Sequence, residues 1–370
     1  MSFLKNLLSK TPPIQSNKAF WDWFQKNERT FFNAVSRDKD VENLFFSKLS
    51  PKLSELKDGY FFLTGMLDDK TAELIITADG HLKNIVFVEE LVASAPQIAG
   101  WKFTALKPGV LDGTSEIKMD NLTFGSKNMK FYYNVDENYP DEIDITIIHD
   151  DWTVSNKETV TTGTHLFLDN YLGELNFATT IDNLNVQSVS DVTLELIPIE
   201  KLKDFLIWRQ KEFIEKYEGK WHNSENDNYV GLEAQLQNGN PLIAVVNADL
   251  LEWDSKASHP WILRLEIRFD GLHTNGMPDS ETYELLNQVE DAMLYELKDH
   301  EGYLNIGRET AESVREIYFA CKDFRKPSKV AHSIIKQYTT KNIKINYNIF
   351  KDKYWKSFDR YRNQGKNEDD

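Results

Sequence analysis

The sequence predicts an α+β protein with two tandem antiparallel-sheet domains and flanking helices. Its 370 residues exceed what one ordinary hydrophobic core organises, so two domains are expected. Apolar residues make up 41% of the chain and aromatic residues 12%, which is enough to fill two cores and argues against disorder. Strand-like and helical segments alternate along the chain, and both halves show nearly the same order of elements.

Residues 1–199 are predicted to form the N-terminal α+β domain, which begins with a helical extension. Segments 17–35 and 40–56 carry apolar side chains at helical spacing, and Pro51 is expected to kink or split the second helix. In each segment that follows, the spacing of the apolar residues is typical of a strand or of a helix. The predicted strands are 60–67, 72–80, 101–107, 128–135, 142–151 and 191–199, and the predicted helices are 84–95 and 159–172.

A charged helix over residues 200–219 is predicted to bridge the halves, and residues 220–362 are predicted to form the C-terminal domain. The expected strands are 228–237, 241–250, 261–270, 302–310, 313–323 and 341–350, and the expected helices are 279–298, a segment that begins at Pro327, and 352–362. After the first hairpin, the order is strand–helix–strand–strand–helix–strand, which is the split βαβ arrangement of ferredoxin-like domains. The tail, 363–370, is expected to be disordered.

Short matches between the halves predict an internal duplication into two ferredoxin-like domains. ELIITADG at 73–80 resembles LEIRFDG at 265–271, and VEELV at 88–92 resembles VEDAM at 289–293. Each match alone is ordinary amphipathic periodicity, but the shared order favours a repeat. Each domain would then either expose one sheet face to a partner or ligand or cover it with the flanking helices.

The composition limits the classes of partner. The formal net charge is -16, which repels nucleic-acid phosphates, so we expect no nucleic-acid partner and favour a protein partner. A stretch of about 18 apolar residues does not occur, so no membrane span is expected. The start of the chain lacks the pattern of a signal peptide, and a cytoplasmic location follows as the expectation. One short apolar helical face at the start could contact a partner or a membrane surface, or simply pack on the protein; it comprises Phe3, Leu4, Leu7 and Leu8.

The search for established catalytic and cofactor motifs is negative. The chain contains no GxGxxG, GxxxxGK[ST], GxSxG, HExxH or CxxC sequence. Its 8 histidines show no metal-ligand spacing, and Cys321 is the single cysteine, which excludes an intramolecular disulfide. We therefore assign no catalytic residue, no metal and no cofactor, and expect binding more than catalysis. His149, next to two aspartates, could hold a metal only with ligands from elsewhere, and it is interpreted as a solvated strand end.

Two arginines form the main candidate ligand site. Arg308 and Arg315 flank a predicted hairpin turn over 309–313, which would place them on neighbouring strands near the same end. A planar guanidinium is suited to carboxylate and phosphate ligands. The acidic residues expected beside the two arginines are Glu309, Asp279 and Glu290. The alternative interpretation is a set of cross-strand ion pairs on a solvated sheet face, each of which contributes little.

A second conspicuous set of residues in this half is aromatic. Such side chains favour cores and interfaces alike, and burial in the core or between domains is expected. The set comprises Trp221, Trp253, Trp261, Tyr318, Tyr354 and Trp355.

Several of these segments together resemble a known family. They are NGMPD, VEDAM, GYLNIGRET and REIYFACKDFR, followed by Tyr354-Trp355. With them, roughly residues 220–362 resemble the bacterial domain-of-unknown-function 695 family, and more distantly the family of the bacterial regulator of ribonuclease E activity B. The second resemblance implies an acidic ferredoxin-like protein that acts by binding an enzyme. The expected function is thus a non-catalytic protein-interaction or regulatory module in the bacterial cytoplasm. The alternative is a small-anion-binding enzyme that uses the arginine–acid cluster.

Overall fold

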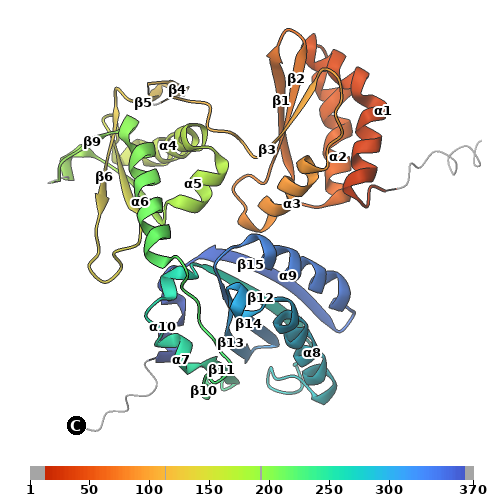
Figure 1. Ribbon diagram of the computed structural model, residues 1–370, viewed down its shortest axis with the longest axis vertical. Helices are drawn as coiled ribbons and strands as arrows, with labels where there is room; N and C mark the ends of the chain where they lie inside the picture. Colours follow the sequence, from red (N-terminus) through yellow and green to blue (C-terminus); the bar gives the residue numbers. More distant parts are fainter. Residues whose placement is uncertain (1–12, 113, 192–193, 363–370) are drawn as a thin grey trace, which may run out of the picture. The chain divides into compact units, whose positions relative to one another are not determined.

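The computed structural model describes residues 13–112, 114–191 and 194–362 of the chain (Figure 1). The predicted amphipathic start and the predicted disordered tail lie outside these residues. The chain divides into two compact units: residues 1–115 with 165–178, and residues 116–164 with 179–370. The sequence instead predicted a domain boundary near residue 199. The α+β class is confirmed, because both units combine helices with sheets that are largely antiparallel.

The first unit packs helices against a three-stranded sheet. Its elements are α1 (Asn17–Ser36), a π-helical segment (Glu42–Phe46), α2 (Ser47–Leu56), β1 (Phe61–Asp68), β2 (Thr71–Thr77), α3 (Leu82–Ala93) and β3 (Trp101–Ala105). β1 and β2 are antiparallel, whereas β2 and β3 are parallel because α3 crosses between them. Aromatic side chains on one face of α1 fill the core, and they include Phe20, Trp21, Phe24 and Phe31. Pro51 lies inside α2, and the expected split falls before it, at the π-helical segment.

The second unit begins with a two-stranded and a four-stranded sheet. β4 (Glu116–Met119) pairs with β5 (Leu122–Gly125), and the larger sheet has the order β8-β7-β6-β9. Its strands are β6 (Met129–Asn134), β7 (Asp144–His149), β8 (Asn183–Gln187) and β9 (Ile197–Pro198). The helices in this part of the chain are α4 (Lys157–Leu172), α5 (Glu174–Thr180) and α6 (Leu202–Tyr217), and residues 165–178 of α4 and α5 belong to the first unit. The sequence did not predict β4, β5, α5 or β8, and among the described residues of the predicted strand 191–199 only those of β9 form a strand.

The predicted duplication requires one ferredoxin-like sheet in the first half, and the described residues do not form it. The strands of that half belong to separate sheets, β1-β2-β3 and β8-β7-β6-β9, and a parallel pair occurs in each. Local strand patterns repeat in the sequence, but strand pairing is decided by long-range packing, which the repeats do not fix. His149 is also not solvated: it is fully buried, and its ring packs on Phe124.

The C-terminal part of the second unit is one six-stranded antiparallel sheet with the order β10-β11-β13-β14-β12-β15 (Figure 1). Its strands are β10 (Tyr229–Gln235), β11 (Pro241–Asn247), β12 (Trp261–Phe269), β13 (Tyr303–Ala311), β14 (Val314–Cys321) and β15 (Ile343–Lys351). Its long helices are α8 (Ser280–Glu296) and α9 (Arg325–Tyr338), with the short α7 (Ala248–Leu251) and α10 (Asp359–Arg362). The predicted helix 352–362 is thus a 3-10 turn followed by a single α-helical turn.

The aromatic set predicted to be buried is divided by the structure. Tyr318 and Trp355 lie in a core on one face of the sheet, with Trp253 packed against it. Trp261 is buried, whereas Trp221 is 60% exposed. Tyr354 donates a hydrogen bond to Asp141 (Oη–Oδ2 2.6 Å), which also pairs with Lys216 of α6 (2.8 Å). These polar contacts join the β8-β7-β6-β9 sheet region to the C-terminal segment within the second unit.

Candidate functional site

A bulge in β13 sets the direction of the Arg308 side chain. Asn305 pairs with Phe319 of β14 and Gly307 pairs with Tyr318, so Ile306 is an extra residue in the ladder. After the bulge, Arg308 and Thr310 point to the sheet face that α8 covers. Gly307 has φ 141°, and a Cβ there would lie 2.2 Å from the Val245 carbonyl oxygen of β11. Glycine is therefore required where this bulge approaches the neighbouring strand.

Arg308 forms an ion pair with Glu290 of α8. Its Nη1 donates to both carboxylate oxygens, at 3.0 Å to Oε1 and 2.9 Å to Oε2. Glu290 is only 6% exposed and lies on the buried face of α8. Its neighbours on that face, Leu286, Val289 and Met293, are apolar. A carboxylate in that position needs a paired charge, since burying an isolated one is strongly unfavourable.

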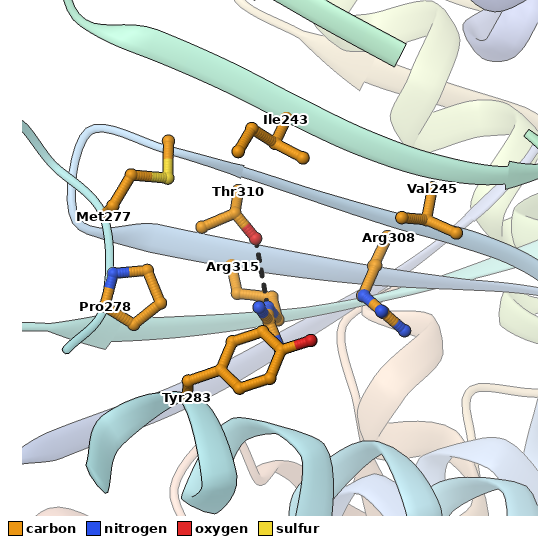
Figure 2. Close-up of a pocket in the computed structure, with 8 residues that line it drawn as sticks. All are labelled: Ile243, Val245, Met277, Pro278, Tyr283, Arg308, Thr310 and Arg315. Carbon is orange, nitrogen blue, oxygen red and sulfur yellow. Dashed lines mark hydrogen bonds between the residues drawn. The ribbon is translucent and has the colours of Figure 1, made fainter. Parts of the chain in front are cut away.

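Arg315 of β14 lies opposite Thr310 in the strand register and is 3% exposed. Its Nε donates to the Thr310 hydroxyl and its Nη1 donates to Asn287 Oδ1 of α8, both at 3.0 Å. The Tyr283 ring lies over the guanidinium, 5.2 Å from Cζ to the ring centroid. Figure 2 shows Tyr283 reaching from α8 across Arg315. Three neutral groups thus fix this cation in a buried position.

The two arginines line one cavity of about 260 Å³ (Figure 2). Its other lining residues are Ile243, Val245, Met277, Pro278, Tyr283 and Thr310. Most of these side chains are apolar, and the guanidinium groups supply the concentrated polarity. Apolar walls with a few fixed polar groups are the usual composition of small-molecule sites.

The electrostatics of the cavity are those of a cation in a low-dielectric setting. Burial lowers the pKa of Arg315, and the charge on Arg308 lowers it further, whereas Glu290 and Tyr283 raise it. An arginine keeps its proton at neutral pH even with such a shift. The site therefore carries two guanidinium charges and one carboxylate charge, a local excess of one positive charge within a chain of net charge -16.

The structure brings together three of the five predicted site residues: Arg308, Arg315 and Glu290. Asp279 is the N-cap of α8, where Oδ1 accepts a hydrogen bond from the Thr282 amide (2.8 Å). Glu309 points to the other sheet face, where it accepts a hydrogen bond from the Tyr361 hydroxyl (2.8 Å). Adjacent strand residues point to opposite faces, so Glu309 and Arg308 cannot share a pocket.

Sequence reasoning missed Tyr283, Asn287, Thr310 and the apolar walls. A more exact placement of the hairpin turn would have identified Thr310. The turn is Glu312-Ser313, with φ 50° and 64°, instead of the broader turn predicted over 309–313. A two-residue turn of that kind sets Thr310 directly opposite Arg315. Ile243 and Val245 come from the added β10–β11 hairpin, whose pairing with β13 no local pattern indicated.

A comparison with protein families identifies residues 234–361 as a match to a family of unknown function, DUF695. This confirms the resemblance for the C-terminal half, and the matched range contains both arginines and Glu290. No curated protein and no solved structure matches the chain.

Over residues 13–112, 114–191 and 194–362, no three or more His, Cys, Asp or Glu side chains are grouped to hold a metal ion. In the same described part of the chain, every helix is too short or too polar to cross a bilayer.

Proposed function

We propose that the C-terminal sheet domain is a non-catalytic binding domain for a small organic anion, held by Arg308 and Arg315. The convergence of both guanidinium groups in one mostly apolar cavity carries this proposal. It favours the small-ligand alternative over a set of separate surface ion pairs, which would point into solvent. The strand order β13-β14-β12-β15 supports ferredoxin-like topology for this region.

The chemistry of the lining supports binding more than catalysis. Arg308 donates hydrogen bonds to both carboxylate oxygens of Glu290, so neither oxygen is free to accept a proton from a substrate as a general base would. The hydroxyl of Thr310 accepts a hydrogen bond from Arg315, and no described base adjoins it to make it a nucleophile. These groups hold a charge in place, as an anion receptor does.

Thermal denaturation with a panel of small anions tests this function. Wild-type protein is expected to be stabilised by at least one anion, and Arg308→Gln and Arg315→Gln are expected to abolish that shift. Arg268→Gln is the matched control, because Arg268 lies on β12 outside the cavity lining and pairs with Glu266 at the surface (2.7 Å). Equal shifts in all four proteins would reject the anion site.

A second candidate function, binding of a basic protein partner, is favoured by the first unit. Phe61, Leu63 and Leu67 alternate along β1 and are 49%, 49% and 52% exposed. They form an apolar stripe on an edge strand of a strongly acidic protein, which favours a cationic partner with an apolar centre. A partner whose binding is weakened by salt and lost in Leu63→Asp, but kept in Leu272→Asp, an exposed position of the second unit, would support this function. Binding unaffected by Leu63→Asp would count against it.

A further inference from the structure

We infer that the ligand of the arginine cavity is a monocarboxylate with a compact apolar body, and not a phosphate or a dicarboxylate. This inference rests on the proposed anion-binding function and specifies its ligand class. It follows from three properties of the cavity, namely its charge, its unused hydrogen-bond donors and its walls.

The charge of the cavity matches one negative charge. Arg308 and Arg315 contribute two positive charges, and Glu290 neutralises one of them through contacts of 3.0 and 2.9 Å. A monoanion therefore leaves the cavity neutral. A dianion leaves an excess negative charge beside the buried Glu290 carboxylate, and a like charge in that setting is unfavourable.

The unused donors fit two acceptor oxygens. Arg315 uses Nε and Nη1 for Thr310 and Asn287, so Nη2 has no acceptor among the described residues. Arg308 uses Nη1 for Glu290, and in the described chain its Nε and Nη2 make no hydrogen bond. A carboxylate can accept from both residues with its two oxygens. The additional oxygens of a phosphate would face Ile243, Val245, Met277 or Pro278 and would lose their hydration without replacement.

The walls fit a short apolar body. Figure 2 shows Met277 and Pro278 at one end of the cavity and Arg308 at the other, with Ile243 between them above Thr310. A headgroup held between the arginines therefore directs the rest of the ligand along apolar side chains and the Tyr283 ring. A cavity of about 260 Å³ has the volume of roughly nine waters at ~30 Å³ each, which corresponds to a ligand of about nine non-hydrogen atoms.

Isothermal titration calorimetry of the full chain tests this inference with matched probes. The probes are benzoate, its neutral isostere benzamide, phenylphosphonate as a dianion, succinate and inorganic phosphate. Benzoate is expected to bind at least tenfold more tightly than each of the others, because it alone combines one charge, two oxygens and an apolar body.

Two variants separate the body from the headgroup. Ile243→Asn places an amide in the apolar wall at a residue that is 39% exposed, so the fold tolerates it. It is expected to weaken benzoate about fivefold or more while leaving acetate unchanged. Val230→Asn is the control, since Val230 is similarly exposed on the adjacent β10 and is outside the cavity lining.

The outcomes are distinguishable from failure of the proposed function. Preference for phosphate, phenylphosphonate or succinate that depends on Arg308 and Arg315 would overturn the monocarboxylate inference and keep the anion site. Equal binding of benzoate and benzamide would show a purely apolar pocket and overturn both. Binding by none of the five probes would also overturn both.

Discussion

Glu290→Gln should make the protein less stable and a better anion binder at the same time. The substitution keeps the shape of the side chain and removes its charge. Glu290 is buried, but the Arg308 side chain is 27% exposed, so water compensates part of the loss. Breaking a fully buried pair costs about 3–5 kcal/mol, and we therefore expect a loss of about 2–3 kcal/mol in the free energy of unfolding.

The gain in affinity has the same origin. Without the carboxylate charge, Arg308 Nη1 faces only a neutral amide, from which a ligand carboxylate can take its hydrogen bond, and the local excess rises from one positive charge to two. One further charge-assisted hydrogen bond is worth about 1.5–3 kcal/mol, which corresponds to roughly tenfold or more in Kd. Dianions such as phenylphosphonate should gain more than benzoate, because the like charge that opposes them is gone.

Urea denaturation and calorimetry measure the two effects separately. Glu266→Gln is the control, since Glu266 pairs with a largely exposed arginine and such pairs contribute about 0–1 kcal/mol. Weaker anion binding by Glu290→Gln would refute the reasoning, because it would mean that the carboxylate itself contacts the ligand instead of competing with it for Arg308.

Three further predictions concern the backbone and buried charges. Gly307→Ala should lower the free energy of unfolding in urea by at least about 2 kcal/mol, since strained backbone alone costs ~1–3 kcal/mol. The same substitution should abolish anion binding, because it turns the Arg308 side chain away from the cavity. A stable variant that still binds would contradict the role of the bulge. Burial lowers the pKa of His259 to about 4, so the unfolded chain binds its proton first and stability should fall between pH 6.5 and 4, whereas His259→Phe should flatten that part of the urea profile. Burial also lowers the pKa of Lys351 to about 8, so its contribution to stability should rise from pH 8 toward 10, and an unchanged profile in Lys351→Met would argue against it.

Local sequence patterns sufficed where neighbours along the chain decide the structure. The alternation in WILRLEIRF placed β12, the helix expected over residues 279–298 is α8, and the Arg308–Arg315 hairpin lay close to its predicted position. The expectation that the two arginines lie together followed from that hairpin alone. Glu290 was also expected near them; it belongs to VEDAM on α8, which lies between β12 and β13 in the chain.

The remaining features depend on pairings between distant segments. Glu309 was predicted beside the arginines because it was assigned to the hairpin turn, whereas it is a strand residue paired with Glu316 and points to the face opposite Arg308. Likewise, no pattern within the first half distinguishes one sheet from two, since the same alternating strands serve either arrangement. The residues that close the cavity are thus those whose strand pairing cannot be determined from local periodicity.

The net negative charge of the chain affects how anions reach the cavity and how they are retained there. A net charge of -16 repels anions at long range, but this repulsion is screened within about 10 Å at 0.1 M salt. Contacts to a guanidinium that is 3% exposed are screened far less. Added salt should therefore speed anion association while changing the dissociation rate little, which is the reverse of what exposed arginines produce. The buried position of Arg315 between Thr310, Asn287 and Tyr283 is what allows a strongly acidic protein to retain an anion.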